Sequence, residues 1–144
     1  MDSCLRFIIP SDFAESRQVQ SRILEELQRY GYAPDAIFAI KLALEEAIIN
    51  AIKHGNKFDP AKVVRIEAHV SPQQTEIIIE DEGAGFERSS VPDPTADENL
   101  HSLHGRGLLL MESYMNEVNY SRGGRRIRLV RRNNGHGQQQ RSGD

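Results

Sequence analysis

The segment from Pro34 to about His54 constrains the fold of this 144-residue chain more than any other segment. Alanine, isoleucine and leucine recur in it at helical spacing, so it predicts a helix with a wide apolar face. Pro34 suits the first turn of such a helix, and Gly55 suits its end. Because so wide an apolar face must be covered by other elements, we expect this helix at the centre of the fold.

A strand and another helix are predicted ahead of this segment. Residues 5–10 have the composition of a short strand, which a proline ends. Residues 11–31 carry a looser helical stripe, with Asp12 and Glu15 resembling a capping box and Gly31 at the exit. The N-terminal part of the chain therefore predicts a strand followed by two helices.

Two hairpins, separated by a loop and a third helix, are predicted after the central helix. Their four strand-like runs are residues 62–70 and 75–82, then 117–121 and 125–132. Between the hairpins, residues 87–104 are long and aperiodic enough for a functional lid, and residues 108–115 have a helical pattern. This order predicts an α+β fold, a two-layer α/β sandwich whose mixed, mostly antiparallel sheet is covered on one face by helices.

Length and composition predict one globular domain. The chain is short for two domains, so we expect a single domain over residues 1–132 and a disordered polar tail over residues 133–144. One cysteine, Cys4, excludes an intramolecular disulfide and fits a reducing compartment. The N-terminus has no pattern of a secretory signal, and no apolar stretch could span a bilayer. We therefore expect a cytoplasmic protein without a membrane partner.

Charge is distributed unevenly along the chain. Residues 1–121 carry 11 basic and 20 acidic side chains, whereas residues 122–144 carry 7 arginines and one aspartate. A basic end could contact nucleic acid or an acidic partner. The interpretation we favour is that residues 125–132 form an edge strand with solvated arginines, because no aromatic residues are interleaved for base stacking. Direct nucleic-acid binding is therefore not expected.

Glu46 and Asn50 stand one helical turn apart on the central helix and would project from the same face. A carboxylate can take a proton from a nucleophile, and an amide oxygen is a hard ligand suited to Mg²⁺. The alternative is a polar stripe, which Glu45 on another face supports. We assign no metal to His54, because no second His or Cys stands at a ligand spacing, and Cys4 has no visible nucleophilic partner.

Two glycine motifs follow this helix along the sequence. Asp81 ends a strand and could accept a hydrogen bond from an exocyclic amine, while Gly83 and Gly85 would let the backbone approach a flat ring. The motif Gly105–Leu108 opens a helix, where free N–H groups bind phosphate oxygens and Arg106 could add a charged contact. Each motif alone is also compatible with ordinary turn or helix-junction chemistry.

The order of these motifs is more specific than any one of them. Glu-x-x-x-Asn on a helix, Asp-x-Gly-x-Gly after a strand, a loop, and Gly-x-Gly-Leu opening a helix resemble the GHKL ATPase superfamily. Within it, the chain is most similar to the bacterial anti-sigma-factor serine/threonine kinases of sporulation and the general stress response. The resemblance covers about residues 5–132 and implies a Bergerat-type ATP-binding fold. Leu103 is a departure, because many members have a third glycine there.

The resemblance implies ATP and Mg²⁺ as cofactors and a role for each motif residue. Glu46 would be the general base that orients or deprotonates the attacking hydroxyl, and Asn50 would ligate Mg²⁺. Asp81 would accept a hydrogen bond from the adenine amine. The remaining nucleotide contacts would come from Gly83, Gly85, Gly105, Arg106, Gly107 and Leu108.

The function that the resemblance implies is a Mg·ATP-dependent serine/threonine protein kinase that acts as an anti-sigma regulatory factor. It would phosphorylate a small anti-sigma-factor antagonist, and the unmodified kinase would hold a sigma factor. A homodimer is also implied. Two alternatives remain at this point. One is a non-catalytic ATP-binding module that sequesters a partner, and the other is the catalytic domain of a histidine kinase.

Overall fold

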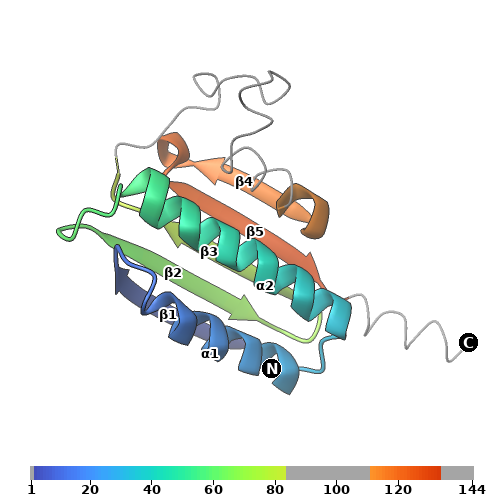
Figure 1. Cartoon of the computed structure of the whole chain (residues 1–144). Coiled ribbons are helices and arrows are strands. Elements are labelled where there is room, and N and C mark those ends of the chain that lie inside the picture. The colour runs from blue at the N-terminus through green and yellow to red at the C-terminus, as the bar shows by residue number, and fades with distance from the viewer. Residues whose placement is uncertain (1, 84–110, 134–144) are drawn as a thin grey trace, which may run out of the picture.

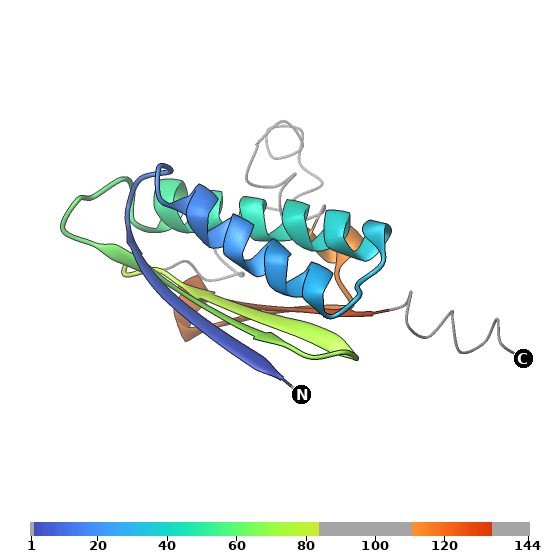
Figure 2. The same ribbon diagram turned by 90° about the horizontal axis from the view of Figure 1, so that it is seen from below.

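Two helices cover one face of a five-stranded sheet, and no helix of the described residues lies on the other face (Figures 1 and 2). The computed structural model describes residues 2–83 and 111–133. The elements are β1 (Ser3–Pro10), α1 (Ser16–Arg29), α2 (Pro34–Ile49), the π-helical turn η1 (Asn50–Gly55), β2 (Val63–Val70), β3 (Gln74–Glu80), β4 (Glu117–Ser121), the 3-10 turn η2 (Arg122–Gly124) and β5 (Arg126–Arg132). Residues 111–114 are helical as well. The expected α+β sandwich is confirmed.

The core lies between the helices and the sheet. Helix α1 packs over β1 and β2, and α2 packs over β3 and β5. Alternate residues of each strand face the helices, and Ile66 and Ile77 are among those that are almost completely buried. Ile40, Leu44 and Ile48 of α2 are equally inaccessible. The apolar face of α2 is therefore covered along its length, as its sequence predicts.

The sheet order is β1-β2-β3-β5-β4, and each of the four strand pairs formed by the described residues is antiparallel. The sequence predicted a mixed, mostly antiparallel sheet, and no parallel pair is found among these strands. The prediction that residues 125–132 form an edge strand was wrong. Strand β5 pairs with β3 on one side and β4 on the other, because the β4–β5 hairpin joins the sheet through β5.

Two arginines of this C-terminal segment, Arg122 and Arg128, are paired with acidic side chains of β3 and β4. Arg128 forms ion pairs with Glu76 and Glu117, and Arg122 lies 2.9 Å from Glu80. Asn133, which the sequence analysis placed in a tail, is buried and donates to the carbonyls of Gln73 and Pro72. Residues 134–144, the rest of that expected tail, lie outside the described residues.

The helix ends differ in part from their predictions. Helix α1 begins at Ser16 without a side-chain cap, so the predicted capping box is wrong. The carboxylate of Asp12 instead accepts from the N–H of Ala14 in the preceding turn, at 2.9 Å. Gly31, at φ +75°, does end the first helical segment, and Pro34 does open α2. No helix in the described part of the chain is long and apolar enough to cross a membrane.

Tyr32 joins the turn between the two helices to the hairpin of β2 and β3. Its buried hydroxyl donates to the carbonyl of Ser71 at 2.7 Å and accepts from the hydroxyl of Thr75 at 2.9 Å. Thr75 is fully buried, so this hydrogen bond replaces the water that its hydroxyl loses on folding. These hydrogen bonds hold the turn between α1 and α2 against the β2–β3 hairpin.

We expect Tyr32→Phe to lower the free energy of unfolding by about 1–3 kcal/mol, because it leaves the buried hydroxyl of Thr75 and the partly buried carbonyl of Ser71 without this partner. Urea denaturation followed by circular dichroism would measure the change. Tyr30→Phe is the matched control, since the Tyr30 hydroxyl bonds only to Ser3 at a partly buried position and should cost less than about 1 kcal/mol. Equal losses in the two variants would contradict this role for Tyr32.

Candidate functional site

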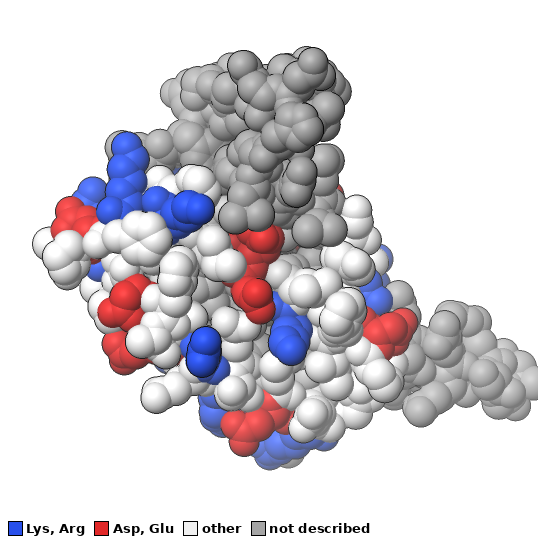
Figure 3. Space-filling model, viewed as in Figure 1, with Lys and Arg blue, Asp and Glu red and all other residues white. Residues whose placement is uncertain are grey.

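Glu46 carries a buried carboxylate oxygen that has no hydrogen-bond partner in the described structure. The residue lies in the last turn of α2 and is half-buried, with its Oε2 atom inaccessible to solvent. Burial raises the pKa of this carboxyl above the ordinary 4.5, the charge of Glu45 raises it further, and Lys53 opposes both. Figure 3 shows acidic side chains over α2 with basic side chains on either side. An unpartnered acceptor of raised basicity is suited to taking a proton.

Asn50 lies one turn after Glu46, as the sequence predicts. Its backbone N–H donates to the carbonyl of Glu46, which is the ordinary α-helical bond. The two side chains therefore leave the same face of the helix, and Asn50 is half-buried like Glu46. Carboxylate and amide oxygens on one face form a donor set that fits a hard divalent cation such as Mg²⁺.

The helix widens into a π-helical turn directly after α2 ends at Ile49. Residues Asn50–Gly55 form this turn, and the N–H of Asn56 donates to the carbonyl of Ala51, five residues back, at 2.8 Å. The predicted helix to His54 is thus continuous, but its last turn is not α-helical. Single π-helical turns occur frequently at functional sites, because they shift the side chains that follow them.

Asp81 meets the end of this turn at a contact that only glycine permits. A Cβ atom on Gly55 would lie 2.3 Å from Oδ2 of Asp81, and one on Gly83 would lie 1.9 Å from the carbonyl oxygen of Gly55. The N–H of Gly83 donates to Oδ1 of Asp81 at 2.8 Å. Gly83 is therefore needed for close approach to the backbone of Gly55, a contact different from the flat ring for which the sequence predicted it. Gly55 is a second such residue, which the sequence analysis treated only as a helix stop.

Burial dominates the electrostatics of Asp81. The side chain is almost inaccessible, and this burial raises the pKa of the carboxyl above 3.8, although the bond from Gly83 and the charge of Arg125 oppose the rise. Its backbone N–H donates to the carbonyl of Arg125 at 2.9 Å, which ties the end of β3 to the start of β5. A buried carboxylate at a strand end is suited to a single, directional hydrogen bond with a flat ligand.

Asn56 is the buried centre of the hydrogen bonds around this contact, and the sequence analysis missed it. Its Nδ2 donates to Oγ of Ser11 at 2.9 Å and to the carbonyl of Val63 at 3.0 Å. Its Oδ1 accepts from the N–H of Glu82 at 2.8 Å. One amide thus joins the ends of β1 and β3 and the start of β2 to the turn η1. No periodicity marks such a residue, because an Asn after a helix-ending Gly is ordinary loop composition.

Asn56 also offsets backbone strain next to the site. Lys57 and Phe58 adopt left-handed backbone angles, with φ of 52° and 58°. This backbone conformation costs a residue other than glycine roughly 1–2 kcal/mol. Asn56 stands directly before these two residues and is hydrogen-bonded to Val63, which follows them, and to Glu82. These bonds fix the two ends of the loop, so the loop keeps one geometry beside Asp81.

The structure describes only part of the predicted site. Glu46 and Asn50 share one face of the helical segment formed by α2 and η1. Asp81 and Gly83, in the segment after β3, contact the end of that segment at Gly55. The other predicted residues, Gly85, Gly105, Arg106, Gly107 and Leu108, lie outside the described residues, as does the predicted lid, residues 87–104.

The sequence matches one known protein family and relatives with kinase and anti-sigma names. Residues 9–131 match the family described as "Histidine kinase-like ATPase domain". The Serine-protein kinase RsbW of Bacillus subtilis is 37% identical over 98 residues, which are 62% of this chain and 60% of that protein. The Anti-sigma F factor of Clostridium perfringens is 38% identical over 82 residues, 55% of this chain and 58% of that protein. The chain therefore spans about 60% of the length of these curated relatives.

A solved structure supports the fold. The crystal structure of the RsbU and RsbW domains of a Mycobacterium tuberculosis protein superposes with a TM-score of 0.59 at 18% identity. The match covers 90% of this chain and 32% of the other. At that level of identity the likeness concerns the fold alone.

We expect Asn56→Ala to lower the free energy of unfolding by about 2–4 kcal/mol, because the buried partners of its amide lose their hydrogen bonds. Chemical denaturation would measure the loss. Asn119→Ala is the matched control, since Asn119 is exposed and its side chain accepts only from Arg128, so its loss should stay within about 0.5 kcal/mol. A similar stability for the two variants would refute the central role of Asn56.

Proposed function

The chain belongs to the histidine kinase-like ATPase domain family, and on that premise we propose that it is a Mg·ATP-dependent serine/threonine protein kinase. Its substrate would be a hydroxyl of a small antagonist protein, and its regulatory role would be that of an anti-sigma factor. The names of two relatives, Serine-protein kinase RsbW and Anti-sigma F factor, support the kinase activity and the anti-sigma role in turn.

The observation that carries the proposal is the unpartnered Oε2 atom of Glu46, one turn from Asn50. We assign Glu46 as the general base. It accepts the proton of the attacking serine or threonine hydroxyl while that oxygen forms its bond to the γ-phosphorus and the bond to the ADP oxygen breaks. The raised pKa of Glu46 makes its ionised form a stronger base than an ordinary carboxylate.

The other site residues would bind and orient the nucleotide. Asn50 would hold Mg²⁺, which neutralises charge on the phosphates when bound. Asp81 would accept from the adenine amine, and the close contact of Gly55 with Asp81 supports a preformed position for this carboxylate. The remaining contacts of the proposal, from Gly83, Gly85, Gly105, Arg106, Gly107 and Leu108, would surround the ring and the phosphates.

The partners belong to the proposal as well. An anti-sigma-factor antagonist would be the phosphoacceptor, and a sigma factor would be the protein that the kinase holds. We propose a homodimer as the working form. A second candidate is a module that binds ATP and holds a sigma factor without phosphorylating anything, which the name Anti-sigma F factor of several relatives favours.

We expect Glu46→Gln to bind ATP normally but to transfer phosphate at least about 100-fold more slowly, because the amide cannot accept the hydroxyl proton. The measurement is transfer of labelled γ-phosphate to an antagonist protein at saturating ATP. Glu45→Gln is the matched control, since Glu45 is the exposed neighbour on another face, and it should keep most of the activity.

The pH dependence gives an independent check on Glu46. The base must be ionised, and burial raises its pKa above the ordinary 4.5. As pH falls, transfer at saturating ATP should therefore be lost at a higher pH than it would be with an ordinary glutamate as the base.

Undiminished transfer by Glu46→Gln would remove Glu46 as the base. Nucleotide binding without any labelled partner in the wild type would select the second candidate, and an acid-labile product would indicate phosphohistidine.

We expect Asp81→Asn to weaken ATP binding by about ten-fold or more, because it replaces a charged acceptor by a neutral amide in a buried position. Calorimetric titration with a nucleotide measures this loss. Asp35→Asn, in the exposed first turn of α2, is the control and should bind like the wild type. Because the pKa of Asp81 is raised, wild-type affinity should decline, as pH falls, before an ordinary aspartate would titrate. Equal affinity in both variants would overturn the adenine assignment.

A further inference from the structure

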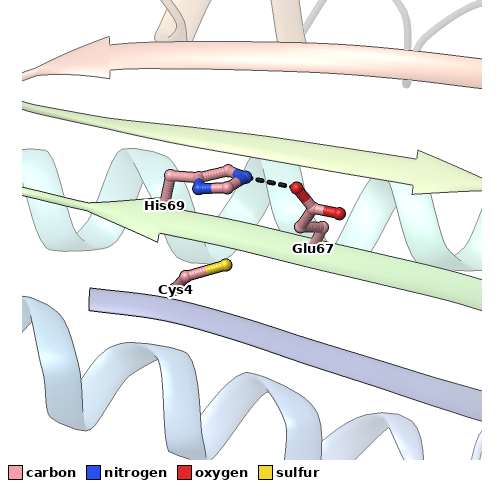
Figure 4. Close-up of side chains that lie close together, drawn as sticks. All are labelled: Cys4, Glu67 and His69. Atoms are coloured by element: carbon pink, nitrogen blue, oxygen red, sulfur yellow. Dashed lines mark hydrogen bonds and ion pairs between the residues drawn. The ribbon is translucent and has the colours of Figure 1, made fainter. Parts of the chain in front are cut away.

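Three side chains with different metal-binding chemistry meet on the sheet face opposite helices α1 and α2. They are Cys4 of β1 and Glu67 and His69 of β2, and Figure 4 shows the ring of His69 directed along β2 at the carboxylate of Glu67, with the thiol of Cys4 on the β1 side of β2. Figure 2 shows both helices on the opposite face of the sheet. The cluster is therefore separated from Glu46 and Asn50 by the thickness of the sheet.

The strand register places these residues together. Cys4 stands directly opposite His69 in the antiparallel pair of β1 and β2, so the Cβ atoms lie within about 4.5–5.5 Å of each other. Glu67 is two residues before His69 and so projects from the same face. The burial pattern agrees, since Ala68, the one residue between Glu67 and His69, is buried on the face that packs against the helices.

The donor atoms are close to the separation that one ion requires. The thiol sulfur, an imidazole nitrogen and a carboxylate oxygen all lie within 4.8 Å of one another. Ligands of one tetrahedral zinc ion stand about 3.2–3.8 Å apart, given bonds of roughly 2.0–2.3 Å. Rotation of exposed side chains covers this difference, because Cys4 is exposed and the other two are only partly buried.

We propose that Cys4, Glu67 and His69 form a binding site for a transition-metal ion of the Zn²⁺ class. Thiolate and imidazole favour zinc over magnesium or calcium, and a carboxylate completes a set of three protein ligands. The fourth position stays open to water. A hollow of about 240 Å³ beside Cys4 and His69, lined also by Ser71 and Gln74, leaves room for it.

The interactions without metal show what the ion would replace. His69 Nε2 is hydrogen-bonded to Glu67, whose other oxygen lies 3.5 Å from the guanidinium of Arg6. Binding exchanges the first bond for two bonds to the ion, and the thiol of Cys4 releases its proton. Arg6 still neutralises the carboxylate. The ion would then cross-link β1, an edge strand of the sheet, to β2.

The test uses the full chain without an affinity tag, kept reduced by a phosphine so that Cys4 remains a thiol. Titration with Co²⁺ should give one ion per chain, a thiolate-to-cobalt charge-transfer band and the visible bands of a tetrahedral ion, and Zn²⁺ should displace the cobalt. Cys4→Ser and His69→Gln should each weaken Zn²⁺ binding by about ten-fold or more, and Cys4→Ser should lose the charge-transfer band.

His54→Gln is the control, because it removes a histidine outside the cluster and should leave the Zn²⁺ affinity unchanged. Cys4 is exposed, so its exchange for serine should leave the far-ultraviolet circular dichroism and the Tm of the metal-free protein as they are. A cobalt complex without the charge-transfer band would overturn the proposal. So would equal zinc affinity in the wild type, Cys4→Ser and His69→Gln.

Discussion

The carboxylate of Asp81 lies directly against the backbone of Gly55, and the geometry of the candidate site depends on that contact. It joins the end of the central helical segment to the end of β3, two points 26 residues apart in the sequence. Neither Gly55 nor Gly83 could carry a side chain without displacing the other elements. Because Glu46 and Asn50 belong to the same continuous helical segment, their positions relative to Asp81 follow from it.

The helical segment reaches this contact through a change in its own geometry. The α-helical bond from Asn50 to Glu46 keeps the proposed base and metal ligand on one face, and the π-helical turn then redirects the chain. Asn56 fixes the result with hydrogen bonds to three other segments. The buried hydrogen bonds of Asn56 that stabilise this end of the sheet therefore lie beside Asp81, a buried carboxyl group of the candidate site.

The two faces of the sheet have different roles. The inner face is apolar and packs against the helices, whereas the outer face carries ion pairs between neighbouring strands. Arg122 and Arg128 of the arginine-rich C-terminal run form ion pairs there with glutamates of β3 and β4. The cluster of Cys4, Glu67 and His69 belongs to this outer face, well away from the proposed nucleotide site.

The sequence alone determined the elements and the local pairs. Apolar periodicity and the positions of Pro34 and Gly31 located the helices and strands to within a few residues, and the four-residue spacing placed Glu46 and Asn50 on one face, because both are properties of short stretches of chain. Only the tertiary structure decided that β5 is an interior strand, that Gly55 must be a glycine, that Asn56 is a buried centre, and that Cys4 stands opposite His69. These features depend on which distant segments meet, and sheet order and strand register are set by packing of the whole core rather than by the residues of any one strand.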